Sequence, residues 1–286
     1  MPPRQLLRLL ATPTRNKALA AKTDIRRCRT SPDAGPGSDR MSTPTGRQSA
    51  RLILGLPRNI PLMNAPRLIV GLGNPTDQHA HDRHNAGFWF IDALLRHYPG
   101  QMRPDAKFLG DVGEVRIGTQ VVRLLKPMTY MNRSGQSVGA LARFYRLEPA
   151  DILVAYDELD LMPGSARLKL GGSSTHNGLR DITAHLGTPR YWRLRLGIGH
   201  PRSLNLNKSV VDFVLGKPSQ SDQQLIDQAI DRSVDHLPIL MRDGWEIATQ
   251  QLHSADPTMQ AKKEAKGSSP KGETGEKTRR SAPEDA

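Results

Sequence analysis

One histidine, one aspartate and three asparagines lie on segments that follow predicted strands, and these residue types can support hydrolysis. They are His84, Asp157 and the asparagines Asn74, Asn132 and Asn177. A neutral imidazole can take a proton from water near pH 7, and a carboxylate can orient that imidazole. Asparagine amides donate hydrogen bonds without titrating, which suits the binding of a carbonyl or of an attacking water. Together these residues favour an active site on the connecting loops.

Each of these residues also has a purely structural interpretation. A histidine before a helix is commonly a cap or a surface residue, and Asn132 and Asn177 are N-cap candidates first. The acidic group at 157–160 could form a solvated turn. With His176 it could instead bind Mg²⁺ for phosphodiester chemistry. Because no second acidic cluster lies on the other loops, a metal-dependent nuclease is the weaker interpretation.

Two other enzyme classes can be tested against motifs. The segment from Gly71 to Thr76 begins like a dinucleotide-binding fingerprint, but Thr76 stands where the third glycine belongs. Pro75 also interrupts the turn, and the next helix is predicted to begin only about ten residues later. No G-x-S-x-G nucleophile elbow is expected, because the sequence of that form at 135–139 falls inside the helix expected over 134–146 and not at a strand-to-helix turn, so a serine hydrolase is unsupported.

The elements that must position these residues alternate between strand and helix. We expect strands over 67–72, 107–117, 120–126, 152–157, 166–170, 193–199 and 210–215, and helices over 86–97, 134–146, 178–186, 220–236 and 243–253. Asn85 is expected to cap the first helix. The alternation predicts a single α/β domain, in which a mixed, mostly parallel sheet lies between helices.

The chain divides into three parts of different composition. Residues 1–65 are basic and lack sustained apolar periodicity, and residues 254–286 are polar and low in complexity. We expect both to be disordered and 66–253 to form the catalytic domain. The first part also fits a mitochondrial transit peptide, or sequence upstream of a true start at Met63. It contains the only cysteine, Cys28, which excludes a disulfide framework, a cysteine zinc site and a thiol nucleophile from the folded part and fits a reducing compartment.

The formal net charge of +13 is distributed unevenly along the chain. Residues 1–65 carry twelve Lys/Arg against three Asp/Glu, whereas 66–253 carry 22 against 19. Within the domain, 167–208 contain eight Lys/Arg and one acid, Asp181. This local excess predicts a surface that faces a polyanion. No run of about 18 apolar residues occurs, so no segment is expected to span a membrane.

Seven sequence blocks in a fixed order resemble the bacterial-type peptidyl-tRNA hydrolases. They are LIVGLGNP at 68–75, RHNAGFWFID at 83–92, KPMTYMNRSG at 126–135, VAYDELDL at 154–161, HNGLRD at 176–181, RLRLGIGHP at 193–201 and FVLGKP at 213–218. The resemblance covers about 66–253. It implies a monomeric α/β enzyme that hydrolyses the ester between a peptide and the 3′ end of tRNA, with no metal or other cofactor. The implied location is the cytoplasm, or the mitochondrion if residues 1–60 are a transit peptide.

The resemblance also implies a role for individual residues. His84 activates the hydrolytic water, and Asp157 hydrogen-bonds and orients that histidine. The residues implied to bind the peptide carbonyls and the ester region are Asn74, Asn132, Asn177 and Tyr130. Those implied to contact the tRNA are Lys169, Arg195 and His79.

The chain departs from the family pattern at three places. His79 stands where the family usually has tyrosine, Thr76 replaces a common glycine, and the loop 171–177 is one residue shorter. These departures concern loops next to the site, whereas the catalytic set is intact. They leave one alternative function, that of a non-catalytic protein with the same fold that binds the tRNA acceptor stem.

Overall fold

The computed structural model describes residues 65–257. The basic extension and the polar tail expected from the sequence therefore fall outside the described residues, except for Ala65 and 254–257. Within 65–257, none of the helices combines the length and the apolar character that crossing a bilayer demands.

Seven strands form one sheet in the order β2-β3-β4-β1-β5-β7-β6. The strands are β1 (Leu68–Gly71), β2 (Arg103–Asp105), β3 (Gly110–Ile117), β4 (Gln120–Pro127), β5 (Ile152–Glu158), β6 (Ala166–Leu170) and β7 (Trp192–Gly197). Parallel pairing joins the four central strands β4, β1, β5 and β7, and the outer pairs β2–β3, β3–β4 and β6–β7 are antiparallel. The predicted α/β class with a mixed sheet is confirmed, and the parallel part is its centre.

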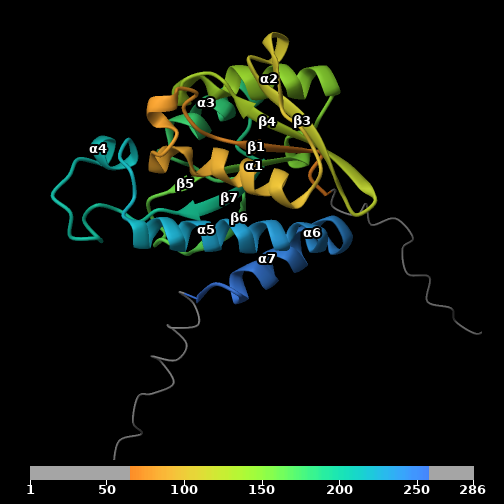
Figure 1. Ribbon diagram of the computed structural model, residues 1–286. Helices are drawn as coiled ribbons and strands as arrows, with labels where there is room; N and C mark the ends of the chain where they lie inside the picture. Colours follow the sequence, from red (N-terminus) through yellow and green to blue (C-terminus); the bar gives the residue numbers. More distant parts are fainter. Residues whose placement is uncertain (1–64, 258–286) are drawn as a thin grey trace, which may run out of the picture. The chain divides into compact units, whose positions relative to one another are not determined.

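Helices cover both faces of the sheet, as Figure 1 shows. They are α1 (Ala86–His97), α2 (Ser134–Tyr145), α3 (Asn177–Leu186), α4 (Val210–Val214), α5 (Gln220–Asp235), α6 (Leu237–Asp243) and α7 (Trp245–Ser254). Side chains of α2 and α3 share one hydrophobic core with the sheet, and side chains of α1 and α5–α7 share the other. Alternate residues of β1 point to opposite faces, so Leu68 and Val70 enter the first core and Ile69 enters the second. Strand β1 is therefore buried on both faces, because each face contributes side chains to one of the two cores.

The last helix closes the edge of the sheet at β6. The Leu168 backbone N–H, on that edge, donates a hydrogen bond of 3.0 Å to Nε2 of His253 in α7. On the same helix, the ring of Trp245 stacks on that of Trp192 from β7, with centroids 4.1 Å apart and planes inclined by 4°. Helix α7 thus covers the β6 edge and satisfies one of its backbone N–H groups, which lowers its availability for pairing with another chain.

The expected strand over 210–215 was wrong, because this segment forms helix α4. Two valines in succession suggested a strand, but the Oγ of Ser209 accepts a hydrogen bond of 3.1 Å from the backbone N–H of Asp212 and caps a helix. The C-terminal helices also differ from the prediction. A separate helix, α6, ends at Gly244, whose φ of 84° suits glycine and redirects the chain into α7.

Candidate active site

Close contact between α1 and the sheet brings the candidate residues together. A Cβ added to Gly71, at the end of β1, would lie 2.2 Å from the carbonyl oxygen of Gly87, and one added to Gly87 would lie 2.3 Å from that of Ala155. Only glycine permits this approach of backbones. The short helical turn η2 (Arg83–Asn85), which precedes α1, therefore lies at the carboxyl ends of β1 and β5. His84 of that turn consequently faces the last residues of β5.

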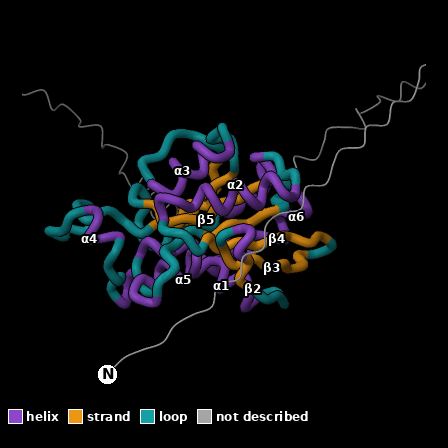
Figure 2. The backbone as a smooth tube through the Cα atoms, turned by 90° about the horizontal axis from the view of Figure 1, so that it is seen from above, coloured by secondary structure: helices purple, strands orange, loops and turns teal. Residues whose placement is uncertain are grey.

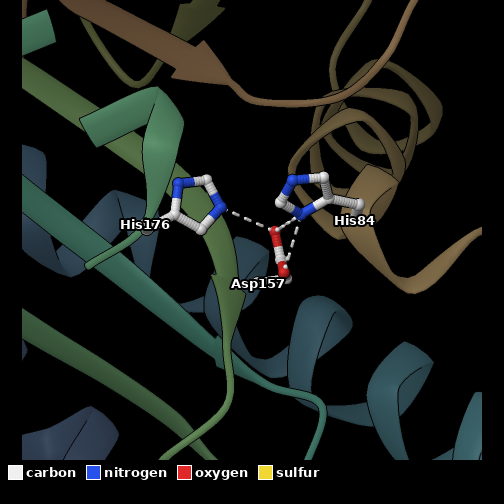
Figure 3. A group of neighbouring side chains, drawn as sticks. All are labelled: His84, Asp157 and His176. Atoms are coloured by element: carbon white, nitrogen blue, oxygen red, sulfur yellow. Dashed lines mark hydrogen bonds and ion pairs between the residues drawn. The ribbon is translucent and has the colours of Figure 1, made fainter. Parts of the chain in front are cut away.

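Asp157 on β5 joins two histidines from different loops (Figure 3). Its carboxylate oxygens lie 2.9 and 3.0 Å from Nδ1 of His84. Oδ1 also lies 2.9 Å from Nε2 of His176, the residue before α3. The side chain of Asp157 is only 2% exposed, whereas that of His84 is 13% exposed and borders a cavity. The arrangement is a buried carboxylate that orients an accessible imidazole.

The charges of this cluster depend on one another. Burial would raise the pKa of Asp157, but the two neighbouring histidines hold it well below its usual range. Burial opposes protonation of His84, yet the Asp157 carboxylate, with a smaller effect of Asp82, raises the pKa of His84 above its ordinary value. An ionised Asp157 accepts the hydrogen bond from Nδ1–H of His84, so Nε2 carries the free lone pair when the ring is neutral. That nitrogen is suited to accept a proton.

His176 is the functional candidate whose role the sequence interpretation missed. In the sequence it stands out only as a partner of the acidic group 157–160 in a magnesium site. The available signal was its position directly before Asn177, at the start of a helix. Within the described residues, the one group of three potential metal ligands that meets is His84, Asp157 and His176, with ligand atoms within 4.8 Å of one another. Of the acidic residues in the weaker magnesium interpretation, Asp157 contacts His176, whereas Glu158 pairs with Arg195.

Asn74 links two of the predicted loops. Its Oδ1 accepts a hydrogen bond of 3.0 Å from the backbone N–H of Met131, and its own N–H donates to Oδ1 of Asn85 at 2.8 Å. The expectation that Asn85 caps α1 through its side chain was therefore wrong, because that side chain binds the backbone of Asn74 instead. These hydrogen bonds hold the loop after β1 against the loop after β4.

The predicted substrate residues surround one open cavity next to His84. Its lining includes the three expected asparagines and Tyr130, together with Met131 and residues of α4: Asn74, His84, Tyr130, Met131, Asn132, Asn177, Val211 and Val214. Tyr130 is 61% exposed. A second cavity adjoins it and is lined by His84, Asp157 and His176. The structure therefore brings the catalytic candidates and the asparagines to the same place.

The residues expected to contact tRNA differ in their surroundings. Lys169 on β6 is exposed, whereas the Nε of Arg195 on β7 donates a hydrogen bond of 2.8 Å to Oε2 of Glu158. Both line a polar cavity on the face of the sheet that α3 covers in part. His79 lies elsewhere, on the loop before α1, with its Nδ1 2.6 Å from the buried carboxylate of Asp82. The three residues thus do not form one continuous patch.

Comparisons with known proteins identify similar sequences. The profile of the peptidyl-tRNA hydrolase family matches residues 68–263. The chain is 52% identical over 192 residues to the peptidyl-tRNA hydrolase of Polynucleobacter asymbioticus, covering 66% of this chain and 98% of that protein. It is 54% identical over 190 residues to that of Bordetella avium, covering 66% and 92%.

Solved structures give the same result. The crystal structure of peptidyl-tRNA hydrolase from Acinetobacter baumannii has 46% sequence identity to this chain and a TM-score of 0.64. The alignment covers 68% of this chain and 98% of that one. A structure of the Arg-to-Gln mutant of the same enzyme aligns with a TM-score of 0.65.

Proposed function

This chain belongs to the peptidyl-tRNA hydrolase family and hydrolyses peptidyl-tRNA, and we propose that a water molecule activated by His84 attacks the ester. The observation that carries the proposal is the pair of contacts, 2.9 and 3.0 Å, between Nδ1 of His84 and the carboxylate of Asp157. These contacts support one tautomer, in which Nε2 faces the open cavity as a base.

In the proposed reaction, Nε2 of His84 takes a proton from water as the water oxygen attacks the ester carbonyl carbon. The positive charge on the imidazole is stabilised by Asp157, which stays ionised because of its lowered pKa. The 3′ oxygen of the ribose then leaves and takes up a proton, which the imidazolium can return. The products are tRNA with a free hydroxyl and the carboxylic acid of the peptide, which ionises and releases one proton to solvent. No covalent intermediate is needed.

The asparagines supply uncharged hydrogen-bond donors next to this base. Within the described residues the amide nitrogen of Asn74 has no protein partner, since only its oxygen and its backbone groups are used. Asn132 and Asn177 are exposed at the same cavity. We assign to these amides the binding of the peptide carbonyls and of the developing oxyanion, and one such donor is worth about 3–4 kcal/mol in other enzymes. Tyr130 lies at the rim, where it would contact the peptide.

For the tRNA, Lys169 is the best supported contact because its ammonium is exposed on the basic segment 167–208. Arg195 would act through a guanidinium that already binds Glu158, and His79 through a ring that already binds Asp82. We further propose that the enzyme acts as a monomer in the cytoplasm. Sedimentation of the protein and localisation of a tagged chain would test these last two points.

Hydrolysis in water enriched in ¹⁸O tests the reaction itself. N-acetyl-aminoacyl-tRNA should be cleaved with one labelled oxygen in the acetylamino acid and none in the tRNA, because the bond to the acyl carbon breaks. Label in the tRNA hydroxyl would mean attack at the ribose and would refute the mechanism. Binding of this substrate without cleavage would instead support the alternative of a non-catalytic acceptor-stem-binding protein.

A further inference from the structure

Helix α4 forms one wall of the active-site cavity, although it makes few core contacts of its own. It has five residues, and isolated helices shorter than about 12 residues are marginal in water. Phe213 is its one buried side chain, whereas Val211 is 63% exposed. Figures 1 and 2 show α4 at the margin of the described domain, outside the helical layers that cover the sheet. Contacts from another element must hold it in place.

Those contacts come from Arg83, the residue before His84. Its Nη1 lies 3.2, 3.0 and 2.8 Å from the carbonyl oxygens of Phe213, Gly216 and Lys217. The guanidinium carbon lies 4.0 Å from the centroid of the Phe213 ring, in a cation–π contact. The last carbonyls of a helix have no partner within the helix and carry partial negative charge. Arg83 therefore binds the last turn of α4 at Phe213 and the segment that follows it at Gly216 and Lys217, from a distant part of the chain.

Arginine adds to these hydrogen bonds a planar group that packs on the Phe213 ring. The Arg83 side chain is 5% exposed, and the nearest carboxylate contact is Asp222 at 3.9 Å. Burial lowers the pKa of Arg83, and the Asp222 carboxylate opposes that shift. Because Asp222 lies beyond hydrogen-bond distance, the hydrogen bonds of this guanidinium go to the three carbonyls. A lysine ammonium is a point charge with a different reach and cannot also stack its plane on Phe213.

The side of α4 that faces the cavity is apolar. Val211 and Val214 line both the cavity at His84 and Asp157 and the neighbouring cavity at the asparagines. The sequence of α4, VVDFV, contains no cation, and its one charged residue is Asp212. Such a surface does not suit an RNA phosphate, whereas an apolar side chain would bury area against it. The wall is therefore suited to the amino acid whose carboxyl forms the ester.

We propose that Arg83 is a positioning residue that fixes α4 beside His84, and that the wall formed by Val211 and Val214 selects apolar side chains on the esterified amino acid. This proposal rests on the function proposed above. His84 of η2 is then the base, and its neighbour Arg83 positions the wall that holds the substrate against this base.

Competition between two substrates tests the selection. N-acetyl-leucine and N-acetyl-glycine are attached to the same acceptor-stem RNA, mixed, and the ratio of their kcat/KM values is measured. The ratio does not depend on how much of a variant is folded. The wild-type enzyme should prefer the leucyl ester by roughly tenfold, and Arg83→Lys should bring the ratio close to one. Val211→Ser changes an exposed side chain, so it should fold, and it should lower the ratio as well.

Arg232→Lys is the matched control. The guanidinium of Arg232 is also partly buried, donates to the carbonyl of Gly164, and keeps its Nε buried without a partner among the described residues. It lines neither cavity at His84. This variant should keep the wild-type ratio, even if it lowers Tm as much as Arg83→Lys does.

A double-mutant cycle completes the test, because Arg83→Lys and Val211→Ser should not add in their effect on the ratio if they act through one wall. A wild-type ratio near one, an unchanged ratio in Arg83→Lys or Val211→Ser, or full additivity would overturn the proposal. A loss that is equal for both esters would also overturn it, since the wall would then contact the ribose or adenine that they share. Failure of the proposed mechanism would be seen separately, as retained hydrolysis after loss of His84.

Discussion

The cluster around Asp157 and the basic segment 167–208 both concentrate charged or titratable side chains, yet they use them differently. In the cluster, both histidines turn their nitrogens toward one carboxylate, and His84 still borders the cavity. In the basic segment, several cations are directed inward. Arg193 donates to the carbonyl of Gly172 at 2.6 Å, and Arg195 is held by Glu158.

A count of charged residues along the sequence does not show which of them are available at the surface. Arg167 also binds inside the domain, 3.2 Å from the buried carboxylate of Asp256, so three of the eight Lys/Arg in 167–208 have partners within the protein. Lys169 is exposed. The local excess of positive charge therefore overstates the surface available to RNA, whereas the positions of Asp157 at the carboxyl end of β5 and of His84 in the turn before α1 report their role more directly.

The largest effect that would test this comparison is expected at His84. His84→Ala should lower kcat by roughly two to four powers of ten, with little change in tRNA affinity, because it removes the proposed base. Single-turnover kinetics and a binding assay separate the two quantities. His97→Ala, at the far end of α1 and 42% exposed, should behave like wild type. Near-normal turnover without His84 would show that the cluster is only structural.

Asp157→Asn should reduce kcat less, by about one to two powers of ten, because the imidazole remains. It should also change the pH profile. His84 acts only when neutral, so activity rises with pH through the pKa of His84. The Asp157 carboxylate raises that pKa, and its loss should move the acidic limb of kcat/KM to lower pH. A profile from pH 5 to 8 measures this shift, and a limb that stayed in place would contradict the assigned role.

Variants of Lys169 and Arg195 should show different effects, because Lys169 is exposed whereas Arg195 has a partner within the protein. Lys169→Ala should reduce the slope of log K against log salt for whole peptidyl-tRNA by about one, without loss of Tm. Arg195→Ala should also weaken binding, but it leaves the carboxylate of Glu158 without its main partner, so Tm should fall. Arg195→Ala combined with Glu158→Gln should recover part of that Tm.

A minimal substrate provides the control for both variants. A blocked amino acid on a short 3′ oligonucleotide lacks the distant phosphates, so neither variant should change its hydrolysis much. If both substrates lost activity equally, these residues would belong with the catalytic cluster, and the comparison between the two regions would fail.

The smallest effect is expected from removing residues 1–62. Both hydrophobic cores are formed within 65–257, so the shortened chain should keep its Tm and its turnover at moderate salt. Thermal denaturation and the hydrolysis assay measure this directly. A loss of stability would mean that the domain boundary expected near residue 66 is wrong.

The sequence predicted what depends on residue type and on neighbours along the chain. Six of the seven strands in the described sheet and most of its helices followed from apolar periodicity, whereas the short strand β2 did not. The candidates His84 and Asp157 and the asparagines followed from their places near the ends of predicted strands and from the resemblance. What it missed depends on contacts between distant segments. The side chain of Asn85 binds Asn74 instead of capping its own helix. In α4, Ser209 caps the first turn and Arg83 binds the carbonyl of Phe213 in the last turn. No periodicity within 210–215 contains that information.

The stacked rings of Trp192 and Trp245 give the protein a built-in optical probe. Two indoles this close, with nearly parallel planes, couple their electronic transitions and should perturb the ultraviolet circular dichroism spectrum. One ring belongs to β7 in the sheet and the other to α7, so the signal reports whether the final helix is docked. Trp89 lies apart on α1, where its indole N–H donates to the carbonyl of Ala80, and it can serve as an internal reference in fluorescence. Undocking of the C-terminal helix could therefore be followed during unfolding without attaching a dye.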